Sequence, residues 1–145
     1  MRFSVVSDAD DETGLHDIVY EVNGAISDTF LDRFYDDSGI SIGVVLMCRD
    51  PRWNFRQRIS FSTKKNCLYT DLMFDWHTMV NADHNTRKKI VAEKIVTEIS
   101  QIIAKYKFKG KYGFKDFDLP RFTKDLREWF ETHGWIEPEF PEVIS

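Results

Sequence analysis

The sequence predicts an α+β fold in which helices pack on a mainly antiparallel sheet of about four strands, in the order βααβββαα. Two neighbouring segments alternate apolar and polar residues, as the half-buried strands of a hairpin do. Other segments repeat apolar residues every three or four positions, which is typical of helices that pack on a sheet. The length of 145 residues predicts one domain over residues 1–136, followed by an extended tail over residues 137–145.

Four segments are expected to form the strands. Residues 3–7 predict the first strand, and the apolar run 40–48 predicts a central strand covered on both faces. Residues 55–63 and 67–76 predict the hairpin, with apolar residues odd-numbered in the first strand and even-numbered in the second. The residue numbers of two paired residues must therefore sum to an odd number if one face is to be apolar. A two-residue turn at Lys65 and Asn66 makes that sum 131. The expected pairs are Phe55 with Trp76, Arg56 with Asp75, and Ile59 with Leu72.

Four segments are expected to be helical. Leu15, Ile18, Val19 and Val22 form a helical stripe that ends at Asn23 and Gly24. A short helix follows around residues 26–34, with Ser27 or Asp28 as its cap. The longest helix is predicted from Asn85 to Tyr106. The last helix begins at Pro120, with Asp118 near its cap, and ends at Gly134.

Charge is strongly segregated along the chain. Residues 1–39 hold ten acids and two bases, residues 40–127 hold nine acids and eighteen bases, and residues 128–145 hold five acids and no base. Such blocks create local fields that steer a charged partner. No segment is long and apolar enough for a signal peptide or a membrane span, and two cysteines are too few for a disulfide framework. We therefore expect a cytoplasmic protein with no membrane partner.

No recognisable catalytic or metal-binding motif occurs in the sequence. The histidines are His16, His77, His84 and His133, and none has the spacing of a known ligand set, although Asp75 with His77 and Asp83 with His84 could converge near one sheet edge. Paired acids such as Asp36 and Asp37 fall in predicted turns. The sequence therefore predicts no enzyme activity, no catalytic residue, no metal and no cofactor.

Two basic segments have alternative interpretations. Arg87, Lys88 and Lys89 lie in the predicted first turn of the long helix, where the helix dipole disfavours cations, so they form a solvated face or meet acids of this chain or of a partner. Residues 105–115 interleave five lysines with four aromatic residues, the composition of a single-stranded nucleic-acid surface. The same tract also suits a helix end with core-facing rings, and an isoelectric point near 5.6 makes nucleic acid the less favoured partner.

Several segments resemble bacterial immunity proteins of polymorphic-toxin and contact-dependent-inhibition systems. The resemblance is carried by residues 69–72 leading to Trp76, by the polar segment 83–89, by Phe117-Asp118 and by residues 126–130. It covers residues 40–135 and leaves residues 1–39 unmatched. The resemblance implies a protein that binds and neutralises a cognate toxin domain, a nuclease being the expected toxin. It assigns no site residues, because the toxin contacts vary between members.

A contact surface is predicted from charge, since a nuclease needs a basic cleft for its substrate and an acidic protein can occupy that cleft. The predicted toxin-binding acids are Asp8, Asp10, Asp11, Glu12, Asp17, Glu21, Asp28 and Asp32. The alternative surface, which would suit an acidic toxin or a nucleic acid, comprises Arg87, Lys88, Lys89, Lys107, Lys109 and Lys111.

Overall fold

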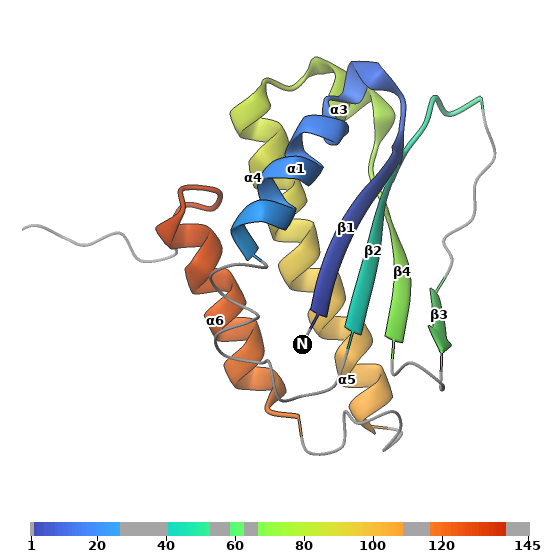
Figure 1. Ribbon diagram of the computed structural model, residues 1–145. Helices are drawn as coiled ribbons and strands as arrows, with labels where there is room; N and C mark the ends of the chain where they lie inside the picture. Colours follow the sequence, from blue (N-terminus) through green and yellow to red (C-terminus); the bar gives the residue numbers. More distant parts are fainter. Residues whose placement is uncertain (1, 27–40, 53–58, 63–66, 109–116, 139–145) are drawn as a thin grey trace, which may run out of the picture.

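The computed structural model describes residues 2–26, 41–52, 59–62, 67–108 and 117–138 (Figure 1). Its strands are β1 (Arg2–Ala9), β2 (Ser41–Cys48), β3 (Ile59–Ser62) and β4 (Cys67–Met73). Its helices are α1 (Leu15–Ile26), α3 (Trp76–Asn81), α4 (His84–Lys94), α5 (Ser100–Phe108) and α6 (Leu119–Thr132). A 3₁₀ turn η1 (Asp11–Thr13) follows β1, and a π-helical segment η4 (Ile95–Ile99) joins α4 to α5.

The described strands form one sheet in the order β1-β2-β4-β3. β1, β2 and β4 run parallel, and the short β3 runs antiparallel beside β4. The predicted mainly antiparallel sheet is therefore wrong. Between β1 and β2 the chain forms α1, and a helical crossover of this kind joins parallel strands. The nearly continuous apolar sequence of β2 is typical of parallel strands and was the signal for this arrangement.

The predicted hairpin exists, but its register differs by two from the prediction. Ile59 pairs with Thr70 and Ser62 with Cys67, so partner numbers sum to 129. The odd parity is confirmed, whereas the sum of 131 and the pair of Ile59 with Leu72 are wrong. Four residues separate the two paired ends of the strands, where a two-residue turn was predicted. Trp76 begins α3 and Asp75 caps it, and Phe55 and Arg56 lie outside the described residues.

The helices agree with the sequence pattern except at their ends. α1 continues through Asn23 to Ile26, so the predicted break at Asn23 is wrong. The long helix consists of α4, η4 and α5 in succession. α6 begins after Asp118, whose side chain accepts a hydrogen bond from the N–H of Arg121 at 3.2 Å, and the chain leaves it at Gly134, which has a φ of 78°. The predicted short helix over residues 26–34 falls almost entirely outside the described part of the chain.

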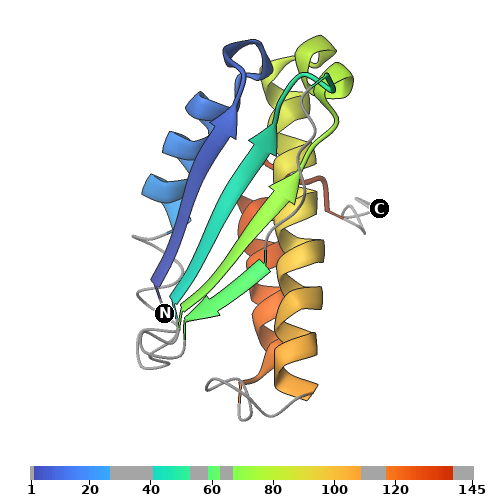
Figure 2. The ribbon, with the colours of Figure 1, turned by 90° about the vertical axis from the view of Figure 1, so that its right-hand side faces the viewer.

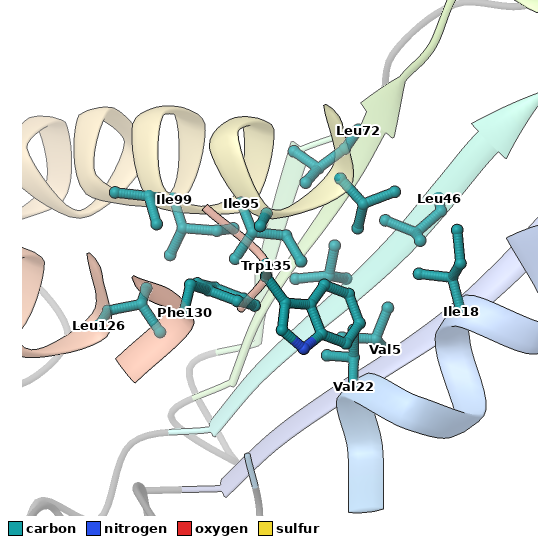
Figure 3. Close-up of a cluster of buried hydrophobic side chains, with 14 of the residues drawn as sticks. Val5, Ile18, Val22, Leu46, Leu72, Ile95, Ile99, Leu126, Phe130 and Trp135 are labelled. Carbon is teal, nitrogen blue, oxygen red and sulfur yellow. The ribbon is translucent and has the colours of Figure 1, made fainter. Parts of the chain in front are cut away.

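The helices gather on one face of the sheet. Figure 2 shows α1 behind β1, and α4, α5 and α6 behind the rest of the sheet, and in Figure 1 α1 and α6 lie to the left of the strands. Between these two layers lies the core, in which side chains from every layer meet around Trp135 (Figure 3). The labelled members of this cluster are Val5, Ile18, Val22, Leu46, Leu72, Ile95, Ile99, Leu126, Phe130 and Trp135. The core therefore fixes α1 and α4 relative to the carboxyl ends of the parallel strands.

β2 is central in the sheet, as predicted, but no described helix covers the second face of the sheet (Figure 2). On that face Val6 is 53% exposed and Tyr69 is 45% exposed. Gly43 is buried beneath Tyr69, since a Cβ at this position would lie 2.9 Å from the tyrosine ring. The expectation of a strand covered by structure on both faces is thus not met by the described helices.

Candidate functional site

The carboxyl ends of β1 and β2 meet beside the start of α3, and the polar residues that follow these strands surround a surface cavity of about 410 Å³. Parallel strands bring such residues together because their carboxyl ends lie at one edge of the sheet, where ligands of α/β proteins commonly bind. The cavity is lined by Ala9, Asp10, Asp11, Glu12, Arg49, Asp50, Arg52 and Trp76.

Asp10 holds this edge of the sheet together. Its carboxylate accepts hydrogen bonds from the N–H of Asp50 at 2.8 Å, from Arg49 Nη1 at 3.0 Å and from Trp76 Nε1 at 3.1 Å. These three donors hold the pKa of Asp10 below its usual value, the Asp50 N–H most strongly, although partial burial opposes them. Asp10 therefore links the ends of β1 and β2 to α3 and offers little free charge to a partner.

Two arginines pair with two further acids, one that lines the cavity and one beside it. Arg49 contacts Asp8 through two of its guanidinium nitrogens, with Nε at 3.0 Å from Oδ1, in addition to its bond to Asp10. Arg52 Nη2 lies 2.8 Å from Asp50 Oδ2, and this contact is the main reason that the pKa of Asp50 lies below its usual value. Asp8 and Asp10 were predicted as toxin contacts, but the structure places both in pairs within the chain.

Glu21, in α1, also forms ion pairs within the chain. Its carboxylate lies 2.8 Å from His84 Nε2 and 3.1 Å from Lys88 Nζ, which joins α1 to the first turns of α4. Burial would raise the pKa of Glu21, but the hydrogen bonds from Lys88 and His84 outweigh it and hold this pKa below its usual value. Glu21 is thus a bridge between two helices.

Three of the predicted acids point into solvent. The side chain of Asp11 is 98% exposed and lies 3.5 Å from His16 Nε2, and Glu12 and Asp17 are exposed as well. Within the described part of the chain no cation forms an ion pair with the carboxylate of Glu12 or Asp17. Asp28 and Asp32 lie outside the described residues. The structure therefore divides the predicted set into acids that support the fold and acids that remain available.

The alternative basic surface is divided in the same way. The guanidinium of Arg87 donates to the backbone carbonyls of Met79, Val80 and Glu12. Lys88 pairs with Glu21 and lies 4.5 Å above the centre of the Trp135 ring, while Lys89 is exposed. Two of the three cations thus serve the fold. Lys109 and Lys111 lie outside the described residues, as does the side chain of Lys107, so most of the lysine and aromatic tract stays a sequence-based prediction.

The histidines and the acids beside them have local roles. Asp75 caps α3 by accepting from the N–H of Thr78 at 2.9 Å, and Asp83 caps α4 in the same way from Thr86 at 2.7 Å. His16 contacts the hydroxyl of Ser7, and the carbonyl of Trp129 accepts a hydrogen bond from His133 Nδ1 at 2.8 Å. No group of three metal-ligating side chains occurs among the residues that the structure describes.

Several residues of this surface were not predicted from the sequence. Arg49, Arg52 and Trp76 line the cavity, and the only signal for them was their position just after β2 and β4 in a sheet whose strands are parallel. Tyr20 projects from α1 with 81% of its surface exposed, three residues beyond Asp17 on the same side of the helix. Tyrosine is enriched among the residues that dominate binding energy at protein interfaces.

The fold and this surface define a small α+β domain whose helices cover one face of a sheet with three parallel strands. More particularly, the chain belongs to the immunity protein 44 family, whose sequence model matches residues 1–132. The match includes the N-terminal acidic segment, which the sequence resemblance had left unassigned, and the predicted membership of the immunity proteins is confirmed. Such a family implies a cognate toxin as the partner. No curated protein and no solved structure matches the chain significantly, and within the described part of the chain no helix has the length and apolarity to cross a membrane.

Proposed function

We propose that this protein binds the toxin domain of its own system and blocks the active or substrate-binding site of that domain, without catalysing a reaction itself. The observation that supports this is the family match over residues 1–132. The expected toxin is a nuclease acting in the cytoplasm, whose basic substrate cleft an acidic surface would fill.

The contact surface that we propose is built from η1 and the first turns of α1. Glu12 and Asp17 are exposed and form no ion pair with a cation of the described residues, and Asp11 is 98% exposed with His16 Nε2 at 3.5 Å. Tyr20, at 81% exposure, supplies an apolar anchor beside them. Tyrosine is enriched among the residues that dominate binding energies, because it buries a large area and loses little side-chain entropy.

The remaining acids of the predicted set have a supporting role in this proposal. Asp8 and Asp10 are bound by Arg49, and Glu21 is bound by His84 and Lys88. Their replacement would affect toxin binding through the stability of the fold, whereas replacement of Glu12 or Asp17 would act on binding directly. Asp28 and Asp32 remain predicted contacts.

A charge-reversal experiment separates this surface from the rest of the protein. Glu12→Lys combined with Asp17→Lys is compared with Glu128→Lys combined with Glu137→Lys, which makes the same charge change at exposed acids of α6 and of the segment after it. Affinity and association rate are measured against the cognate toxin domain, at two salt concentrations. We expect the first pair to slow association by about tenfold or more and to flatten its salt dependence, and the second pair to have a small effect.

Equal effects of the two pairs would contradict the proposed surface. Tyr20→Ala provides a second test that is independent of charge. Because Tyr20 is largely exposed, its removal should leave thermal unfolding unchanged while raising the dissociation rate by about tenfold or more, as loss of an interface anchor does. A toxin that remains fully active with a stoichiometric amount of the wild-type protein would contradict the neutralising function itself.

A further inference from the structure

Among the described strands, β1 pairs with β2 alone, so its outer edge has no described strand beside it. In a strand, the N–H and C=O of one residue point to the same side and alternate along the chain. The N–H of Asp10 bonds the carbonyl of Cys48, at the end of β2, so even-numbered residues of β1 face β2. Odd-numbered residues, Val5 among them, therefore present their backbone groups to the outer edge.

The side chain of Asn23 occupies this edge at Val5. The N–H of Val5 donates to Asn23 Oδ1 at 2.8 Å, and Asn23 Nδ2 donates to the carbonyl of Val5 at 2.6 Å. One amide thus satisfies both backbone groups, as a residue of a neighbouring strand would. At the next outward position, the hydroxyl of Ser7 contacts His16 from the same helix. α1 therefore covers the edge of β1 with polar side chains.

We propose that Asn23 closes the β1 edge against a second copy of this chain and so keeps the protein monomeric. An exposed strand edge is a template for pairing with another chain, and native proteins block such edges with covering elements or charges. Two copies of β1 related by a two-fold axis at Val5 would pair antiparallel through the same N–H and C=O groups that Asn23 binds. Val6, 53% exposed on the face away from α1, would lie opposite Ser4 of the second copy and lose part of its exposed surface there.

This inference does not depend on the identity of the toxin. The second copy is the favoured occupant because its β1 supplies eight residues of identical length and pairing pattern, together with an apolar Val6 that gains burial. Strand addition by a different chain would need the same displacement of Asn23, and a monomeric Asn23→Leu variant with a higher affinity for the toxin than the wild type has would indicate it instead.

The test replaces Asn23 by leucine, which keeps the branched shape of the side chain and removes both hydrogen bonds. Sedimentation velocity over a wide range of concentrations should find a monomer for the wild type and a concentration-dependent dimer for Asn23→Leu. Asn81→Leu is the matched control, since Asn81 donates to the carbonyl of His77 within α3, away from the edge, and this variant should remain monomeric. Adding Val6→Lys to Asn23→Leu should restore the monomer, because a lysine on an edge strand opposes pairing.

A folded Asn23→Leu variant that stays monomeric would overturn the proposal, as would a dimer that Val6→Lys leaves intact. If Asn23→Leu does not fold, amide hydrogen exchange in the wild type tests the proposal instead. The Val5 N–H of the wild type, although it lies at a sheet edge, should exchange far more slowly than in an unstructured peptide. It should also exchange slowly in Asn23→Asp, because aspartate retains the acceptor oxygen. Exchange of the wild-type Val5 N–H at the peptide rate would show that Asn23 does not close the edge.

Discussion

The guanidinium of Arg87 lies directly against the backbone of Gly14. A Cβ atom at Gly14 would stand 2.2 Å from Arg87 Nη1, and Gly14 has a φ of 70°, which glycine adopts readily. From this position Arg87 Nε donates to the carbonyl of Met79 at 2.7 Å, and Nη2 donates to that of Glu12 at 2.9 Å. A cation that the dipole of its own helix disfavours is therefore held by carbonyls at the end of α3 and in η1.

We expect Gly14→Ala to destabilise the fold more than Gly134→Ala does. Both glycines have positive φ, so alanine at either position incurs a left-handed backbone cost of about 1–2 kcal/mol. The space beside Gly134 is open, whereas Gly14 also faces the guanidinium. The free energy of unfolding, measured in urea, should fall by about 1 kcal/mol for Gly134→Ala and by about 3 kcal/mol or more for Gly14→Ala.

A double variant identifies the cause of the difference. Arg87→Ala removes the atoms that a methyl group at Gly14 would meet, so the combined loss for Gly14→Ala and Arg87→Ala should be smaller than the sum of the two single losses. Additive losses would mean that the guanidinium moves aside without cost.

Asp10→Asn should destabilise the protein although it changes few atoms. The carboxylate of Asp10 accepts from the N–H of Asp50 and from Trp76 on one oxygen and from Arg49 on the other, and an amide retains one acceptor. The loss of a buried or partly buried charged hydrogen bond is typically about 1.5–3 kcal/mol. Glu12→Gln, at an exposed position nearby, should change the unfolding free energy by less than about 0.5 kcal/mol. Similar small values for both variants would contradict the supporting role of Asp10.

Local pattern accounts for most of the helices but not for the direction of the strands. The start of α6 at Asp118 and its exit at Gly134 follow from capping chemistry, which acts over a few residues. Strand direction depends on contacts between segments far apart in sequence. The apolar alternation in residues 59–73 is compatible with either a parallel or an antiparallel strand on the other side of β4. Parity fixed which residues share a face of the hairpin, but loop length decided the register.

The site was predictable only as a distribution of charge. The acidic character of residues 8–21 was evident in the sequence, but which acids are free depends on partners from distant segments. Arg49 reaches Asp8 and Asp10 because β1 and β2 are parallel neighbours, and Lys88 reaches Glu21 because α1 and α4 lie side by side on the sheet. Neither relationship leaves a signal in local spacing.

Cys48 should resist thiol reagents while the protein is folded. It is 1% exposed at the end of β2, and burial, with the neighbouring Asp10 and Asp75 charges, raises the pKa of its thiol to about 11. The reactive thiolate is therefore scarce at neutral pH. In a Cys67→Ser variant, which leaves Cys48 as the single thiol, a disulfide reagent should react slowly before and rapidly after denaturation. Rapid reaction of the folded variant would mean that this end of β2 opens readily.

The bridge from Glu21 to α4 should make stability depend on pH in the acidic range. The hydrogen bonds from Lys88 and His84 overcome the effect of burial and hold the folded-state pKa of Glu21 below its ordinary value of 4.5. A depressed pKa contributes stability that is fully present above the unfolded-state value and is lost as pH falls through the folded-state value.

A double-mutant cycle at several pH values measures this contribution. Glu21→Gln, Lys88→Met and the double variant give the coupling energy between the two side chains. The coupling should be constant from pH 7 down to about 5 and should decline below the ordinary pKa of 4.5, as Glu21 becomes protonated. His84 also faces Glu21, so the cycle is repeated with His84→Gln to remove its contribution. A coupling that persists unchanged at pH 3 in this background would show that contacts other than the ionised Glu21 join α1 to α4.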